Sequence, residues 1–220
     1  YPSGGGGAAF YRADNVLFEN STIANNVSNH NSGGGIFFGS ESGDASIVVH
    51  ATFNRLTLVN NSALSGGAIF CWSAILNLYH STLAQNEASN SEWSGGGLAS
   101  HYVSRPNIRS SLFYNNLPNS IHNGYPQTPV LVAYSLVQEQ WAGWGNLIDI
   151  DPLFCDPDSG DYSLAENSPC VGTGEDGSNM GAFGVGCEAI LSTDKDVIPL
   201  QYILHQNYPN PFNPVTTLRY

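Results

Sequence analysis

Four side chains have the clearest potential for ligand chemistry: Phe37, Phe70, Trp72 and His101. Phe37 and Phe70 each follow an aliphatic residue in a glycine-rich segment, and Trp72 lies two positions beyond Phe70. Side chains of a strand alternate between its two faces, so all four point outward if their aliphatic neighbours point inward. Sugar rings offer apolar C–H faces that stack on such side chains. We therefore predict a glycan-binding row at these four residues.

An open alternative is that a loop folds over this aromatic row and removes it from solvent. Two segments could do so: residues 119–127, which are rich in Asn, Gly and Pro, and residues 39–46, which are inserted into one repeat. Glycine, proline and short polar residues in clusters are typical of loops. The sequence does not decide between an open row and a covered one.

Acidic residues could support acid–base or calcium chemistry, but their spacing does not assemble a catalytic set. A lyase would need stacked acidic calcium ligands with a basic residue, and a hydrolase would need clustered carboxylates. In the repeat register Glu19 aligns with Asn54 and Tyr79, so no column of carboxylates forms. The Asp-rich residues 156–161 lack the glutamate that closes an EF-hand loop, and we interpret them as a turn. We predict no catalytic residue, no metal and no cofactor.

Three of the four cysteines, Cys155, Cys170 and Cys187, cluster late in the chain. Clustered cysteines indicate either a disulfide in an oxidising compartment or a zinc site. No C-x-x-C pair accompanies them, and the six histidines are scattered without metal-ligand spacing. We therefore expect a disulfide among these three candidates, although the spacing does not select the pairing.

The elements that position these residues repeat along the chain. The glycine-rich segment reads SGGGI at 32–36, SGGAI at 65–69 and SGGGL at 94–98, with a looser copy at 4–7. A second piece follows each copy, and the interval from Ser65 to Leu83 equals that from Ser94 to Leu112. Segments that recur about every 30 residues are typical of stacked repeats, and their short apolar alternation is that of strands. The sequence predicts an all-β parallel β-helix, a solenoid of stacked coils.

Stacking places equivalent residues of successive coils above one another. Ile36, Ile69 and Leu98 are expected to form one inward column. A column of corner amides is expected at Asn26, Asn61, Asn86 and Asn116, where each side chain bonds to its neighbours along the stack.

The composition changes towards the C-terminus, and from these changes we predict four segments. Residues 1–148 carry the β-helix coils, 149–187 have no Gly-Gly motif and are expected to form a disulfide-stapled C-terminal cap, and 188–197 are a polar linker. Residues 198–220 form a short tail rich in Pro and Asn. An open β-helix end exposes unpaired strand edges, which is why a terminal unit of different composition is expected.

Several motifs resemble known families. Asp151-Pro-Leu-Phe, Gly160-Asp-Tyr-Ser-Leu, Ser168-Pro-Cys and Met180-Gly-Ala-Phe-Gly resemble bacterial right-handed parallel β-helix repeat proteins. The GGAI at 66–69 and the FYNN at 113–116 resemble the GGAI and FxxN repeats of chlamydial polymorphic outer-membrane proteins. The QNYPNPFNP run at 206–214 resembles the start of the C-terminal sorting domain of type IX secretion, in truncated form. These resemblances imply a right-handed β-helix, an extracellular bacterial setting and the type IX machinery as a partner.

The charge excludes one large class of partner. The chain has a formal net charge of −12 with six Lys and Arg, whereas nucleic-acid binding needs basic residues that neutralise phosphates. No stretch is long and apolar enough for a membrane span.

Taken together, these features favour a secreted or cell-surface protein that binds a polysaccharide or surface glycan without catalysis, as an adhesin-like module. A polysaccharide lyase or glycoside hydrolase acting on acidic polysaccharide is the first alternative, and a structural spacer is the second.

Overall fold

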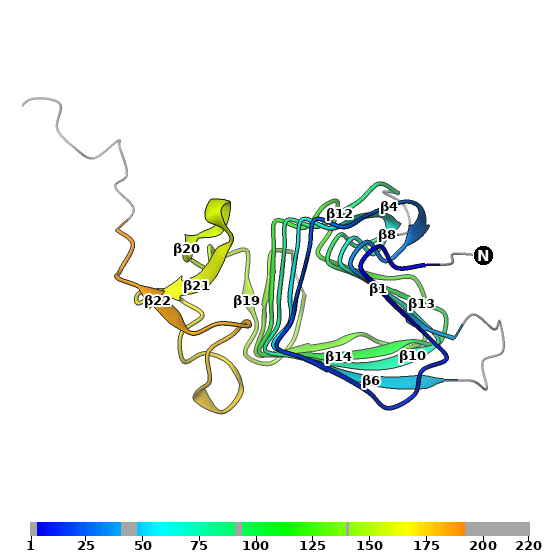
Figure 1. The fold of residues 1–220 in the computed structure, drawn as a ribbon. Coiled ribbons are helices and arrows are strands. Elements are labelled where there is room, and N and C mark those ends of the chain that lie inside the picture. The colour runs from blue at the N-terminus through cyan, green and yellow to red at the C-terminus, as the bar shows by residue number, and fades with distance from the viewer. Residues whose placement is uncertain (1–3, 41–47, 91–93, 140, 192–220) are drawn as a thin grey trace, which may run out of the picture. The chain divides into compact units, whose positions relative to one another are not determined.

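A computed structural model describes residues 4–40, 48–90, 94–139 and 141–191 of the 220-residue chain. These residues are almost entirely strand and turn, and the strands before residue 149 belong to stacked parallel sheets of the kind expected for a β-solenoid (Figure 1). In the later strands, β20 (Phe154–Asp156) pairs with β21 (Asp161–Ala165) antiparallel. The chain divides into a unit of residues 1–190 and a second unit of residues 191–220. The predicted tail at 198–220, and with it the sorting-domain motif, lies outside the described residues.

Three long sheets form the walls of the stack. Sheet A contains β1 (Ala8–Tyr11), β5 (Ile36–Gly39), β9 (Ile69–Trp72), β13 (Leu98–His101) and β16 (Ile121–Asn123). Sheet B contains β2 (Val16–Glu19), β6 (Val49–Asn54), β10 (Ala74–Tyr79), β14 (Arg105–Arg109) and β17 (Leu131–Ala133). Sheet C contains β3 (Thr22–Ala24), β7 (Thr57–Val59), β11 (Thr82–Ala84), β15 (Leu112–Tyr114), β18 (Leu136–Val137) and β19 (Leu147–Ile148).

Two smaller sheets complete the described fold. Sheet D, between sheets C and A along each coil, contains β4 (Val27–Ser32), β8 (Ser62–Ser65) and β12 (Glu87–Ala88). Sheet E contains β20 (Phe154–Asp156), β21 (Asp161–Ala165) and β22 (Val185–Cys187), with short 3-10 turns at Pro157–Ser159 and Glu175–Gly177. No helix in the described ranges is long and apolar enough to cross a membrane.

The predicted inward column is confirmed. Ile36 pairs in register with Ile69, and Ile69 pairs with Leu98. All three side chains are fully buried in the core that sheets A, B and C enclose. Burying branched aliphatic side chains between coils contributes about 1.5–3 kcal/mol each, so the column is a main source of stability.

The predicted amide ladder is also confirmed. The Nδ2 of Asn26 donates to the Oδ1 of Asn61 at 3.0 Å, that of Asn61 to Asn86 at 3.0 Å, and that of Asn86 to Asn116 at 2.9 Å. The residue before each amide, such as Asn60 with φ of 55°, is in the left-handed conformation that turns the chain. Asparagine tolerates this conformation better than most residues, which explains the amide-rich corners.

A second ladder runs along the corner between sheets B and C. The Oγ of Ser81 accepts from the N–H of Leu56 at 3.1 Å, and the Oγ of Ser111 accepts from the N–H of Ser81 at 3.2 Å. The residues just before this ladder are again left-handed, as at Arg55 with φ of 53° and His80 with φ of 43°. The corner therefore holds its backbone rigidly and points the side chains of Arg55 and His80 away from the core.

The segment expected to close the end of the stack lies elsewhere. Phe154, Tyr162, Leu164, Cys170 and Met180 pack in one buried cluster with residues on the outer face of sheet C: Val59, Ala84, Leu112 and Leu136. The segment at 149–187 is thus a lateral unit against one wall, and Figure 1 shows its strands beyond the wall that contains β19. The segment therefore covers apolar residues on the outer face of sheet C and does not have the expected position at the end of the stack.

Trp141 takes part in covering the stack. It is half-buried and packs against the main core of the coils. The Nδ2 of Asn146 donates to the carbonyl oxygens of Val132 and Trp141, both at 3.1 Å, and so holds this segment against the last coil.

The disulfide joins Cys155 to Cys187, two of the three predicted candidates. Cys170, the third candidate, is a buried free thiol. Cys170 packs with the apolar residues that join the lateral unit to sheet C, whereas the disulfide links β20 and β22.

Candidate ligand-binding surface

The predicted aromatic row exists, but most of it is not open to a ligand. Phe37 pairs with Phe70 and Trp72 pairs with His101 in register, as expected. Phe37 is 1% exposed and Phe70 is 3% exposed, while Trp72 and His101 are partly buried. The prediction that Phe37 and Phe70 are exposed binding residues is therefore wrong.

Ring stacking accounts for part of this burial. The Phe37 and Phe70 ring centroids are 5.8 Å apart, and Phe70 lies 5.1 Å from the His101 ring, with small interplanar angles in both pairs. Aromatic side chains in register on neighbouring coils cover one another's faces, because coils stack about 4.8 Å apart. The row stabilises the outer face of sheet A and leaves little ring face for a sugar.

The outer face of sheet B carries a different pattern. Thr52, Asn77 and Asn107 occupy one register column, and the Nδ2 of Asn107 donates to the Oδ1 of Asn77 at 3.2 Å. A parallel column contains Glu19, Asn54, Tyr79 and Arg109, as the repeat register predicted for its first three members. Hydroxyl, amide, aromatic and charged groups therefore face outward in rows on one rigid sheet.

One hollow of about 560 Å³ lies where this face meets the lateral unit. It is lined by Asn54, Tyr79, His80, Arg109, Ser110 and Glu175, and we call it the corner hollow. Nη1 of Arg109 and Oε1 of Glu175 form an ion pair across it, and the N–H of Glu175 donates to Oγ of Ser110 at 2.9 Å. The hollow thus combines an aromatic ring with donors and acceptors held in place.

A second hollow, of about 290 Å³, lies near the opposite end of the same strands. It is lined by Asn15, Val16, Leu17, His50, Ala51, Thr52 and Asn77. Beside it the Oδ1 of Asp14 accepts from the backbone N–H of His50 at 2.8 Å and lies 2.9 Å from Nδ1 of that ring. These hydrogen bonds lower the pKa of Asp14.

The carboxylates around sheet B are already engaged. Asp14 pairs with His50, Glu175 pairs with Arg109, and the Oε1 of Glu19 accepts from Nδ2 of Asn54 at 3.2 Å. A hydrolase of this class needs two carboxyl groups on either side of the scissile bond, one of them protonated near neutral pH. In the described residues no such pair faces a shared hollow.

The Asp-rich residues 156–161 form a turn, as interpreted from the sequence. The Oδ1 of Asp156 accepts from the N–H of Ser159 at 3.2 Å, and the Oδ1 of Asp161 accepts from the N–H of Ser163 at 3.0 Å. The hydroxyl of Ser163 also donates to Asp161, and this bond, followed by the backbone bond from Ser163, lowers the pKa of Asp161. These hydrogen bonds occupy carboxylate oxygens that a calcium ion would need. No group of three potential metal ligands occurs within the part of the chain that the structure describes.

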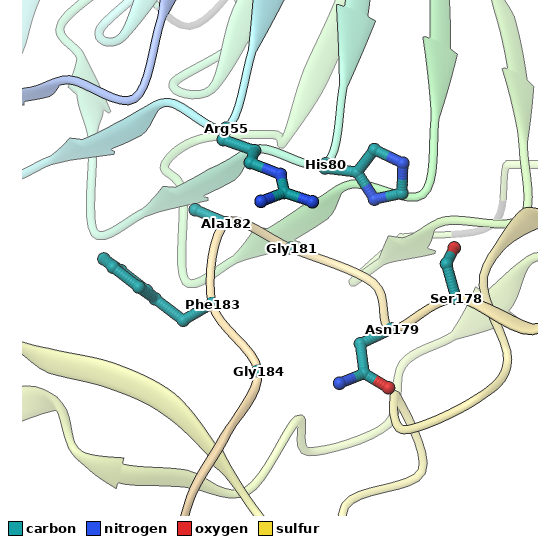
Figure 2. Close-up of a pocket in the computed structure, with 8 residues that line it drawn as sticks. All are labelled: Arg55, His80, Ser178, Asn179, Gly181, Ala182, Phe183 and Gly184. Carbon is teal, nitrogen blue, oxygen red and sulfur yellow. The ribbon is translucent and has the colours of Figure 1, made fainter.

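A third hollow, of about 310 Å³, separates the B–C corner from a loop of the lateral unit (Figure 2). It is lined by Arg55, His80, Ser178, Asn179, Gly181, Ala182, Phe183 and Gly184, and we call it the loop hollow. His80 lines both this hollow and the corner hollow, so the two are neighbours.

Sequence reasoning missed the residues that the lateral unit brings to sheet B. The repeat register already aligned Glu19, Asn54 and Tyr79. It treated Arg55 and Arg109 as equivalent, whereas Arg109 pairs with Tyr79 and Arg55 lies one position later, level with His80. Glu175 lies 66 residues beyond Arg109 in a segment without repeats, so no spacing signal could place it there.

Comparisons of this chain with models of protein families, with curated proteins and with solved structures found no match to any of them.

Proposed function

We propose that this chain is a secreted or cell-surface protein with a right-handed parallel β-helix that binds a glycan without catalysis. The outer face of sheet B is the proposed binding surface, with the corner hollow at its centre. The observation that carries the proposal is the convergence of Asn54, Tyr79, Arg109 and Glu175 around that one hollow. Sugars are recognised by planar amide, guanidinium and carboxylate groups beside an aromatic ring, and this set supplies each of them.

A rigid wall suits such a ligand. The strands of sheet B are hydrogen-bonded to neighbours on both sides along most of the stack, so outward side chains keep a fixed spacing. Preorganised groups lose little conformational entropy on binding, which matters for a flexible and well-hydrated polymer. The row of Thr52, Asn77 and Asn107 extends the polar surface beyond the corner hollow along the stack.

Two features support an extracellular location. The Cys155–Cys187 disulfide is of a kind that persists mainly in oxidising compartments. The resemblance of residues 206–214 to a type IX sorting signal points the same way, and these residues lie outside the described part of the chain. The type IX machinery is the proposed partner of that tail.

A glycan array followed by calorimetry on the best ligand tests the proposal. We expect binding by the wild type, and a loss of about tenfold in Tyr79→Ala, because a stacked ring contributes about 0.5–1.5 kcal/mol. Tyr79→Phe keeps the ring and should retain most of the affinity. Tyr125→Ala serves as the matched control, since Tyr125 lies in a loop that follows sheet A.

Three outcomes contradict the proposal. Absence of binding to every glycan leaves the structural spacer as the better description. Unchanged affinity in Tyr79→Ala, with an unchanged melting temperature, removes the corner hollow from the binding surface. Release of reducing ends or unsaturated products from an acidic polysaccharide, abolished by Glu175→Gln, favours the lyase or hydrolase alternative.

A further inference from the structure

The loop hollow has a wall of donors on the coil side. Arg55 and His80 occupy equivalent left-handed corner positions of successive coils, and both side chains leave the core at that corner. Figure 2 shows the guanidinium of Arg55 and the ring of His80 on one side of the hollow, with the loop of residues 178–184 on the other.

The opposite wall is anchored to the coils. The N–H of Gly181 donates to the carbonyl oxygen of Ser110 at 2.8 Å, and the N–H of Ala182 donates to Oγ1 of Thr82 at 3.0 Å. Gly181 has φ of 89°, and a Cβ there would lie 2.6 Å from Cδ1 of Leu112, so only glycine lets the loop approach this closely. The loop hollow is therefore preformed.

The polar groups of the loop hollow are mostly donors. The Oδ1 of Asn179 accepts from the N–H of Gly172 at 2.9 Å, which leaves the amide nitrogen of Asn179 as the group available to a ligand. The described residues that line the loop hollow include no carboxylate. Throughout the described ranges, neither Arg55 nor His80 has a side-chain hydrogen bond or an ion pair, whereas Arg109 is paired with Glu175.

Among the described arginines Arg109 has an ion pair, whereas Arg12, Arg55 and Arg105 have none, and Arg55 is the one of these three that lines one of the three hollows. Acidic residues outnumber basic ones by 18 to 6, so a carboxylate partner for Arg55 would be easy to supply. A guanidinium that faces a preformed hollow beside an imidazole and a free amide nitrogen is suited to a planar or tetrahedral anion. These observations point to an acidic ligand group rather than to a neutral one.

We propose that the loop hollow binds the acidic group of a saccharide, either a uronate carboxylate or a sulfate ester. The inference rests on the proposed function, because His80 joins this hollow to the corner hollow and the acidic residue would belong to the same glycan. The net charge of −12 opposes an anionic ligand at long range. At physiological ionic strength this repulsion is screened beyond about 8 Å, so the contacts with Arg55, His80 and Asn179 determine the outcome.

Matched pairs of ligands that differ in charge test this proposal by calorimetry in 0.15 M salt, an ionic strength at which screening acts over about 8 Å. Oligogalacturonate is compared with its methyl ester, and dextran sulfate is compared with dextran, so that the two arms distinguish a carboxylate from a sulfate ester. Arg55→Asn and His80→Asn remove the donors. Asparagine occupies the same left-handed corner position at Asn20, with φ of 49°, so these variants keep the backbone geometry.

We expect the wild type to bind at least one acidic ligand about tenfold or more tightly than its neutral counterpart, and Arg55→Asn to remove most of that preference. Arg12→Asn is the control, because it removes the same charge from an exposed left-handed corner outside the three hollows. Equal affinity for acidic and neutral ligands, with both weakened by Tyr79→Ala, overturns this inference and leaves the glycan-binding function intact. Failure of every ligand pair and of the array to bind overturns both proposals.

Discussion

Arg109, on the outer face of sheet B, forms an ion pair with Glu175 of the lateral unit, although 66 residues separate them in sequence. Each side chain is 37% exposed, so the pair is reached by solvent. It joins the wall of the coils to the lateral unit at the corner hollow, and both residues line that hollow.

Replacing Glu175 by Gln should weaken glycan binding more than it weakens folding. Exposed ion pairs contribute up to about 1 kcal/mol to stability, so the urea midpoint should fall only slightly. Loss of the carboxylate acceptor and of the constraint on Arg109 should lower affinity by several fold. Calorimetry and urea titration on the same samples check both parts, and a large loss of stability with normal affinity would show that the pair is structural.

Replacing Ile69 by Asp should prevent folding. Ile69 is fully buried between Ile36 and Leu98, and an unpaired carboxylate there would have neither water nor a cation nearby. Circular dichroism and size-exclusion chromatography measure the result. Leu64→Asp, at a side chain that is 41% exposed on β8, is the control and should fold. A normal melting curve for Ile69→Asp would mean that inward and outward faces are exchanged.

Replacing Asn86 by Ala should cost about 2–4 kcal/mol. Its Nδ2 donates to the carbonyl oxygens of Leu58 at 2.8 Å and Ala84 at 3.0 Å, and its Oδ1 accepts from Asn61. These buried groups lose their partners together, and each unsatisfied group costs about 1–3 kcal/mol. Asn26→Ala, at the half-buried end of the ladder, should cost less. Chemical denaturation of both variants tests this order, which equal costs would contradict.

Removing the disulfide with Cys155→Ser and Cys187→Ser should lower the free energy of unfolding by about 3–4 kcal/mol, since the disulfide closes a segment of 32 residues. Urea titration of the double variant and the wild type measures this difference.

Cys170 and Cys71 should stay unmodified by iodoacetamide in the native protein. Burial raises the pKa of Cys170 to about 12 and raises that of Cys71 further, so little thiolate forms. Mass spectrometry after alkylation counts the modified sites, and native labelling of Cys170 would contradict its burial.

His122 should make stability depend on pH. Burial lowers the pKa of His122, and its Nε2 is buried without a hydrogen-bond partner. The unfolded chain, with a histidine pKa of about 6.5, therefore takes up the proton first as pH falls. The free energy of unfolding should therefore be highest above the unfolded-state pKa of about 6.5 and should decrease as the pH falls below it. His122→Phe keeps a ring beside His101 and should reduce this decrease between pH 8 and pH 5 in urea titrations, whereas an unchanged slope would contradict the assignment.

Much of the fold was predictable because the sequence repeats, so residues at equivalent positions of successive repeats are expected to be neighbours in space. The glycine-rich segments SGGGI, SGGAI and SGGGL placed Ile69 under Leu98, and the recurring corner amides placed Asn61 beside Asn86. The expected equivalence of Leu83 and Leu112 was wrong by one residue, because Leu83 pairs with Phe113 and Leu112 pairs with Thr82 on the outer face of sheet C. Burial of the aromatic row was not predictable in the same way. The register placed Phe37 beside Phe70, but only the packing of rings at 5.8 Å decided that their faces are closed to a ligand.

The sequence by itself determined the stacked strands, the inward column and the amide corners. Each of these depends on a residue and its equivalent in the next coil, and a repeat records that relation directly. Only the tertiary structure decided that residues 149–187 lie against sheet C instead of closing the stack, that Cys155 pairs with Cys187, and that Glu175 meets Arg109. Those contacts join a segment without repeats to the side of the coils, so they depend on which apolar surface is left to cover, and spacing along the chain carries no record of it.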